Sequence, residues 1–228
     1  MHHLMRPRWI AGHLLVVVAL IVFVSLGFWQ LRRLDEKQAF NVAVAAGLEA
    51  PSVGIGSARS EPYVRVTATG EYDVGAEVLV LRSRNGVSGH HVLTPLDLGG
   101  GRGVLVDRGW VPITLDRPGD PQAGPPAGEV TVEGVLWPAQ FGGVPDEPAA
   151  VVPRIDPALV AGSVSFELDP GRYLVLLGQD PEGGELPIAE EPPPLSVGPH
   201  LGYAVQWFLF AGVVLVGYPI LLRRRLEG

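Results

Sequence analysis

Two long apolar stretches, one near each end, constrain this chain more than any other feature of its sequence. The second stretch, Tyr203–Leu222, contains no charged residue and is closed by Arg223–Arg225. At ~1.5 Å per residue, a helix of this length is roughly 30 Å long, which is the thickness of the apolar core of a bilayer. Tyr203 and Trp207 stand at its beginning, where aromatic side chains collect at a membrane interface. We therefore predict a transmembrane helix over residues 200–222.

The first apolar stretch, Ile10–Phe28, is flanked by Trp9 and Trp29. Its length predicts another transmembrane helix over residues 9–29. Helix-favouring residues follow without a break, so we expect the helix to continue to residue 46. A cleavable secretory signal is the alternative, because small residues lie near the end of the stretch. The stretch is nevertheless long for the apolar part of a signal peptide, and this favours a membrane span.

A chain with two spans has both termini on the same side of the membrane. The predicted tails, residues 1–8 and 223–228, carry five arginines, whereas three basic residues, Arg32, Arg33 and Lys37, follow the first span. Because basic residues accumulate on the cytoplasmic side, we expect cytoplasmic termini and an extracytoplasmic central region. Only eight residues precede the first span, too few for a mitochondrial presequence, so we expect a multi-pass protein of a bacterial plasma membrane.

Between the spans, residues 47–199 show the period-two alternation of β-strands. The alternation is clearest at Tyr63–Tyr72 and at Glu129–Glu133, and short apolar runs bounded by turn residues add further strands. Arg84–Gly86 has the composition of a tight turn between two such runs. The pattern predicts roughly six to eight strands, and therefore a mainly antiparallel β domain that is either a barrel or a sandwich.

Charge and residue usage exclude several classes of function. From Gln38 to Gly202 there are 9 arginines and 21 acidic residues, a formal charge of −12, which argues against binding to nucleic acid. The chain has no cysteine, so it has neither a disulfide nor a thiolate with which to bind a soft metal. Both methionines lie in the N-terminal tail, and this too argues against a copper chaperone.

The sequence also lacks recognisable catalytic signatures. It contains no His-Glu-x-x-His motif, no nucleophile elbow and no complete phosphate-binding glycine motif. We therefore expect no enzymatic activity, and an extracytoplasmic hydrolase is the weakest alternative. Asp107–Trp110 is interpreted as a strand that runs into a turn at Gly109, with Arg108 in a structural ion pair. His90 and His91 are adjacent on a predicted strand, so their side chains leave on opposite faces, and we interpret them as a polar strand end instead of a metal site.

His200 stands alone at the entrance to the last span. A neutral imidazole at this place is able to bind haem iron. The macrocycle would then lie against aromatic side chains of both helices, and its propionates would pair with basic side chains at the same interface. These surrounding candidates are Tyr203, Trp207, Trp29, Arg32 and Arg33. Residue chemistry alone favours a structural role, because a histidine before a helix often caps backbone N–H groups.

Five sequence blocks follow one another along the chain. They are Gly27–Lys37, Val66–Asp73, Gly89–Leu96, the Leu-Val-Asp-Arg-Gly-Trp-Val-Pro block at Leu105–Pro112, and His200–Phe208. In composition and order they resemble the motifs of the surfeit-locus cytochrome c oxidase assembly factors. The resemblance extends from one end of the chain to the other, apart from residues 113–128 and 139–190.

This resemblance implies two membrane helices around an outward β domain. It implies a role in the assembly of haem-copper terminal oxidases such as cytochrome c oxidase, at the step in which subunit I acquires its haem. It also implies that His200 binds haem a, because the histidine at this position is a haem a ligand in some bacterial members. These are expectations from similarity, and the spacing of residues does not by itself produce them.

Our first hypothesis is an assembly chaperone of the respiratory chain that receives haem a from its synthase and delivers it to subunit I. The alternative is a stable accessory subunit that holds the oxidase, or a supercomplex containing it, together without binding haem. Either hypothesis makes the oxidase and the lipid bilayer the partners of this protein, and the first adds haem a synthase.

Overall fold

The computed structural model describes residues 7–58, 63–142, 149–190 and 195–227. The chain forms two compact units, one built from residues 1–42 and 194–228 and the other from residues 43–193. The first unit contains two apolar helices, and the second contains a mixed, mostly antiparallel β sheet. The predicted fold class, two apolar helices flanking a β domain, is confirmed.

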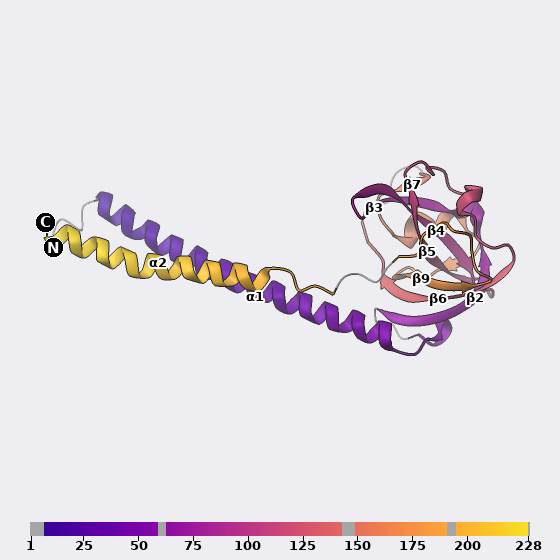
Figure 1. Ribbon diagram of the computed structural model, residues 1–228, viewed down its shortest axis with the longest axis horizontal. Helices are drawn as coiled ribbons and strands as arrows, with labels where there is room; N and C mark the ends of the chain where they lie inside the picture. Colours follow the sequence, from indigo (N-terminus) through magenta and orange to yellow (C-terminus); the bar gives the residue numbers. More distant parts are fainter. Residues whose placement is uncertain (1–6, 59–62, 143–148, 191–194, 228) are drawn as a thin grey trace. The chain divides into compact units, whose positions relative to one another are not determined.

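The two helices are α1 (Pro7–Glu49) and α2 (His200–Glu227), which are labelled in Figure 1. Each is long and apolar enough to cross a bilayer, over Trp9–Glu49 and His200–Arg225. α1 continues past Trp29 without a break and ends at Glu49, three residues beyond the end predicted at residue 46. Most apolar side chains of both helices are exposed in the isolated protein, as expected of surfaces that face lipid.

Six longer strands make up most of the β domain (Figure 1). They are β2 (Val64–Tyr72), β3 (Val78–Arg84), β4 (Val87–Asp97), β5 (Arg102–Pro112), β6 (Glu129–Pro138) and β9 (Arg172–Asp180). Three further strands have two residues each: β1 (Val53–Gly54), β7 (Val151–Val152) and β8 (Glu167–Leu168). The β3–β4 turn is a two-residue hairpin in which Arg84 pairs with Val87, and it uses the positive φ angles of Asn85 and Gly86, 51° and 80°.

Five of the strands close into a ring, so the domain is a barrel and not a sandwich. Around the ring the order is β2-β6-β9-β5-β4, and β4 pairs again with β2 at Glu71–Asp97 and Tyr72–Leu96. The β5–β9 pair is parallel, and the other four pairs are antiparallel. Numbered along the chain, the ring runs 1-4-5-3-2, a strand order that five-stranded OB-type barrels share. β3 lies outside the ring and pairs with β4 and β7.

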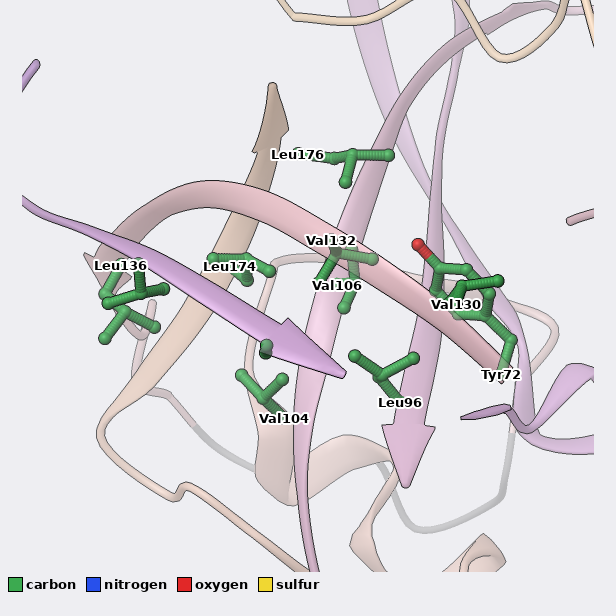
Figure 2. Packing of buried hydrophobic residues seen from close by; sticks show 11 residues of the cluster. Tyr72, Leu96, Val104, Val106, Val130, Val132, Leu136, Leu174 and Leu176 are labelled. Atoms are coloured by element: carbon green, nitrogen blue, oxygen red, sulfur yellow. The ribbon is translucent and has the colours of Figure 1, made fainter. Parts of the chain in front are cut away.

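Apolar side chains fill the interior of this barrel. Figure 2 shows Val and Leu side chains from all five ring strands, together with Tyr72, converging on one cluster. Val66, Val106, Val132 and Leu174 are each 0% exposed. A barrel with so few strands is narrow enough for side chains to fill it. The interior is therefore a packed core, and binding sites of this domain are to be sought outside the ring.

Another apolar cluster lies on the outer side of the sheet. It joins Val80 of β3, Leu93 of β4 and Leu105 of β5 to residues between Val152 and Val175. Part of that segment is the short 3₁₀ turn Pro157–Leu159, which begins at Asp156 as an N-cap, with the side chain of Asp156 accepting a hydrogen bond from the N–H of Ala158. The part of the β6–β9 connection from Val152 to Leu168 thus covers one face of the sheet.

Candidate functional site

His200 is the first residue of α2, and it is held by a side chain from the other helix. Its Nδ1 lies 2.9 Å from Oε1 of Gln30, and Gln30 is only 9% exposed. An amide oxygen only accepts hydrogen bonds, so Nδ1 carries the proton and donates it to Gln30. In the neutral imidazole the other ring nitrogen, Nε2, has a free lone pair. This is the arrangement of a metal-binding histidine, whose second nitrogen is commonly fixed by such a hydrogen bond.

The Nε2 edge of His200 faces a residue without a side chain. A Cβ at Gly198 would lie 3.5 Å from both Nε2 and Cδ2 of the imidazole. The backbone there has φ of +68°. A Cβ here would be in ordinary van der Waals contact with the imidazole, so the positive φ is what favours glycine, and glycine places no side chain beside Nε2.

Close packing of α1 on α2 fixes the geometry of this pair. A Cβ at Gly27 would lie 2.6 Å from the ring of Phe208, so a larger residue there would force this ring to move. Ala204 of α2 is 1% exposed, another small residue at the contact. Towards the other end of the pair, the ring of Phe23 stacks on Trp207, and His13 hydrogen-bonds the hydroxyl of Tyr218. The two helices are therefore joined along their length, with the His200–Gln30 pair at one end.

In the described part of the chain, the remaining sequence-predicted site residues make no hydrogen bond, ion pair or ring stacking with His200. Trp207 packs on Phe23, while Tyr203 and Trp29 are 48% and 44% exposed. The guanidinium of Arg33 lies 6.0 Å from the ring centre of Trp29 and pairs with Glu36 at 2.7 Å. Arg32 is exposed.

The sequence reasoning missed Gln30, the residue that actually contacts His200. A usable signal was present, because Gln30 is an amide at the end of an apolar stretch, and polar groups at such positions usually face a partner.

A separate group of ionisable side chains surrounds His91 in the β domain. Nδ1 of His91 is 2.8 Å from Asp107 Oδ2, and Nε2 is 3.2 Å from Glu190 Oε2. Burial by itself lowers the pKa of this imidazole, but the hydrogen bonds and charges of the two carboxylates outweigh it and raise the pKa to about 9. His91 is therefore a cation at neutral pH.

The interpretation of His90 and His91 as a polar strand end was wrong. Both side chains are buried within β4, at 4% and 7% exposure, and they leave on opposite faces as predicted. The error arose because a later segment covers His91: Ile188 pairs with Trp110, the residue opposite His91, and Glu190 contacts the imidazole. Among the described residues there is no cluster of three or more side chains able to bind a metal ion.

The Asp107–Trp110 block forms a β-bulge, and the predicted turn at Gly109 was also wrong. Trp110 lies opposite His91 and Asp107 opposite Leu93, so β5 has one extra residue here. Gly109 adopts φ of +117° within the strand, which then continues to Pro112.

The structural ion pair predicted for Arg108 is confirmed. Its Nη1 lies 3.3 Å from Glu77 Oε2, with both side chains almost fully buried. Burial lowers the pKa of Arg108, and the charge of Glu77 opposes that shift.

A hydrolytic triad does not form at this place. Ser83, His91 and Asp107 line one cavity, the set of residue types that such chemistry uses. In a triad, Nε2 of the histidine faces the serine hydroxyl, but here it faces the carboxylate of Glu190. The described geometry therefore gives no support to the hydrolase alternative.

Comparison with known proteins adds an independent finding. The model of the SURF1 family matches residues 17–212, which include the whole barrel, most of α1 and the first half of α2. This chain belongs to the SURF1 family. Its members are known as oxidase assembly factors and not as enzymes, which associates this protein with oxidase assembly.

Individual relatives agree with the family match. Uncharacterised SURF1-like proteins of Mycobacterium bovis and Mycobacterium tuberculosis are 31% identical over 230 residues, covering 94% of this chain and 83% of theirs. A SURF1-like protein of Rickettsia felis is 32% identical over 102 residues, covering 43% of this chain and 45% of its own. Family membership and the two apolar helices together support a membrane location.

Proposed function

We propose that this SURF1 family protein assists oxidase assembly by holding haem a at His200 and passing it to subunit I. The observation that carries the proposal is the His200–Gln30 hydrogen bond, which leaves the Nε2 lone pair of His200 available to iron. The haem is cargo in this proposal and is received from haem a synthase. A single protein ligand at a helix end suits a temporary carrier, because one bond to iron is easily exchanged.

The neighbouring side chains suit the rest of the cargo. Tyr203 and Trp29 are exposed aromatic residues near His200, and Trp207 lies further along α2, so all three are able to contact an apolar macrocycle. Arg32 and Arg33 are exposed cations one turn beyond Trp29 and supply partners for two propionates. To bind a propionate, Arg33 would give up its ion pair with Glu36. That pair is exposed to solvent, so breaking it costs little free energy.

Haem content of the purified protein tests this proposal. The full chain is expressed with haem a biosynthesis, purified in detergent, and its haem quantified from the absorption spectrum. We expect His200→Ala to lose the bound haem, and Gln30→Leu to retain it with roughly 10-fold weaker affinity, because the imidazole is no longer oriented. His13→Ala is the matched control, since His13 belongs to the same helix pair but bonds Tyr218, and it is expected to keep its haem.

Two outcomes would contradict the proposal. One is a His200→Ala protein with the haem content of the wild type. The other is a wild-type protein that never carries haem but purifies with the oxidase at a fixed ratio, which would establish the accessory-subunit alternative.

We also propose that the β domain lies outside a bacterial plasma membrane, with both termini in the cytoplasm. The five arginines in the tails against three basic residues after the first apolar stretch support this orientation. Reporter fusions placed after residue 60 and after Gly228 should then report opposite sides of the membrane. Reporters on the same side would refute the two-span topology. A cytoplasmic reporter after residue 60, with an extracytoplasmic reporter after Gly228, would refute the proposed orientation.

A further inference from the structure

The β domain contains a cavity that neither the family role nor the haem proposal uses. It has a volume of about 260 Å³ and lies outside the ring of strands. Trp137, Ile155 and Val175 form apolar parts of its wall, and Arg82, His91 and Tyr173 contribute polar groups. An apolar hollow with a few convergent polar groups is the usual form of a small-molecule site.

The imidazole of His91 presents one fixed hydrogen-bond donor to this cavity. Asp107 Oδ2 accepts a hydrogen bond from the Nδ1–H of His91, and Oδ1 accepts one from the N–H of Gly109 at 3.1 Å. Asp107 is thus fully engaged, and its side chain is 3% exposed. The ring cannot turn without losing this bond, so the Nε2–H always points the same way.

Two further groups add donors beside the imidazole. Tyr173 is 5% exposed and lines the cavity, and its hydroxyl has no hydrogen-bond partner in the part of the chain that the structure describes. Arg82 donates to Gln140 Oε1 at 3.0 Å and to the carbonyl of Leu81 at 3.2 Å, which uses two of its five N–H groups. Three donors, two of them cationic, therefore converge on one small volume.

Glu190 is the carboxylate that now occupies this set of donors. It accepts from Nε2 of His91 at 3.2 Å, yet its side chain is 42% exposed. The segment that carries it is tied to the barrel separately, because Ile188 and Trp110 exchange two backbone hydrogen bonds of 2.8 Å each. Glu190 is thus able to swing away while its segment stays in place. Without it, Arg82 and His91 outweigh Asp107 by one positive charge.

We propose that this cavity binds a small apolar carboxylic acid, whose carboxylate replaces that of Glu190 at His91 and reaches Arg82 and Tyr173. The apolar body of the ligand packs against Trp137, Ile155 and Val175. Glu190 is then an internal occupant of the site, and it closes the cavity when no acid is present. This site is independent of His200 and of haem.

Binding of 3-phenylpropionate to the full chain in detergent, measured by titration calorimetry, tests the proposal. Glu190→Ala is expected to bind this acid at least ~10-fold more tightly than the wild type, because the competing carboxylate is gone. The neutral amide of the same shape is expected not to bind. Arg82→Met is expected to weaken binding about 10-fold, because a charge-assisted hydrogen bond is lost.

Arg117→Met serves as the matched control, since the side chain of Arg117 is 89% exposed, pairs with Asp116 at 3.9 Å and does not line the cavity, and it should leave binding unchanged. Thermal unfolding of each variant verifies that it is folded. Equal binding of acid and amide, or a Glu190→Ala protein that binds no more tightly than the wild type, would overturn the proposal and leave the His91–Glu190 contact as a purely structural link. Undiminished binding by Arg82→Met would overturn it as well.

Discussion

Replacing Glu77 by alanine is expected to destabilise the β domain by about 3–5 kcal/mol, because it leaves the charge of Arg108 buried without its partner. Glu77 accepts three hydrogen bonds: from Thr94 Oγ1 at 2.7 Å, from the N–H of Gly119 at 2.7 Å and from Arg108 Nη1 at 3.3 Å. These groups come from β4, β5 and the loop after β5, so one carboxylate joins three segments. Its side chain is 3% exposed, and water cannot replace it.

The measurement is thermal unfolding of the full chain in detergent, followed by the β-sheet signal in circular dichroism. For a domain of this size the expected loss is roughly 8–15 °C in Tm. Glu133→Ala is the matched control, because Glu133 also pairs with an arginine, Arg65, but at the surface with 38% of its side chain exposed. Exposed pairs contribute about 1 kcal/mol or less, so its Tm should change little. Equal losses of Tm for the two variants would show that burial of Glu77 does not increase its contribution to stability, which would contradict the prediction.

Gly109→Ala is expected to produce the other large effect, a destabilisation of about 3 kcal/mol or more. With φ of +117°, the backbone of Gly109 lies in a region that residues with a Cβ rarely adopt. A Cβ would also lie 2.2 Å from the carbonyl oxygen of Ile188, which is a backbone atom with little freedom to move. The substitution should therefore break the Ile188–Trp110 pairing and release the segment that carries Glu190.

Unfolding of the variant is measured in the same way, and release of the segment is measured by faster hydrogen exchange at the amide of Ile188. Gly178→Ala is the control within another ring strand, because a Cβ there meets nothing within 4 Å and its φ is not positive. A Gly109→Ala protein as stable as Gly178→Ala would mean that the bulge adapts to a side chain, contrary to this account.

The elements of this fold could be predicted from the sequence because they depend on local patterns. An uncharged run such as Tyr203–Leu222 has few alternatives to a membrane helix, and the alternation at Tyr63–Tyr72 has few alternatives to a strand. The closure of the ring was not predictable in the same way, since it rests on the pairing of Tyr72 with Leu96 and of β5 with β9. Strand alternation contains no information about which strands meet.

The candidate sites illustrate the same limit at the level of single side chains. His200 was selected from its position, but its partner Gln30 is 170 residues away, and only packing of the helices brings them together. His91 was misinterpreted because its environment depends on Asp107 in the next strand and on Glu190 almost 100 residues later. Arg108 was interpreted correctly because a buried arginine requires a carboxylate wherever it lies.

The position of β9 in the ring dictates the order in which this protein is able to mature during synthesis. β9 is the last strand of the chain, yet it lies between β6 and β5, so both of those strands keep an unpaired edge until residues 172–180 have been made. Such edges are prone to pair with other chains, and pairings between distant segments form slowly. α1 is made before the domain, and α2 begins at His200, only twenty residues after the end of β9. The sheet is therefore completed only by the last part of the domain to be made, and few residues separate that part from the second apolar helix.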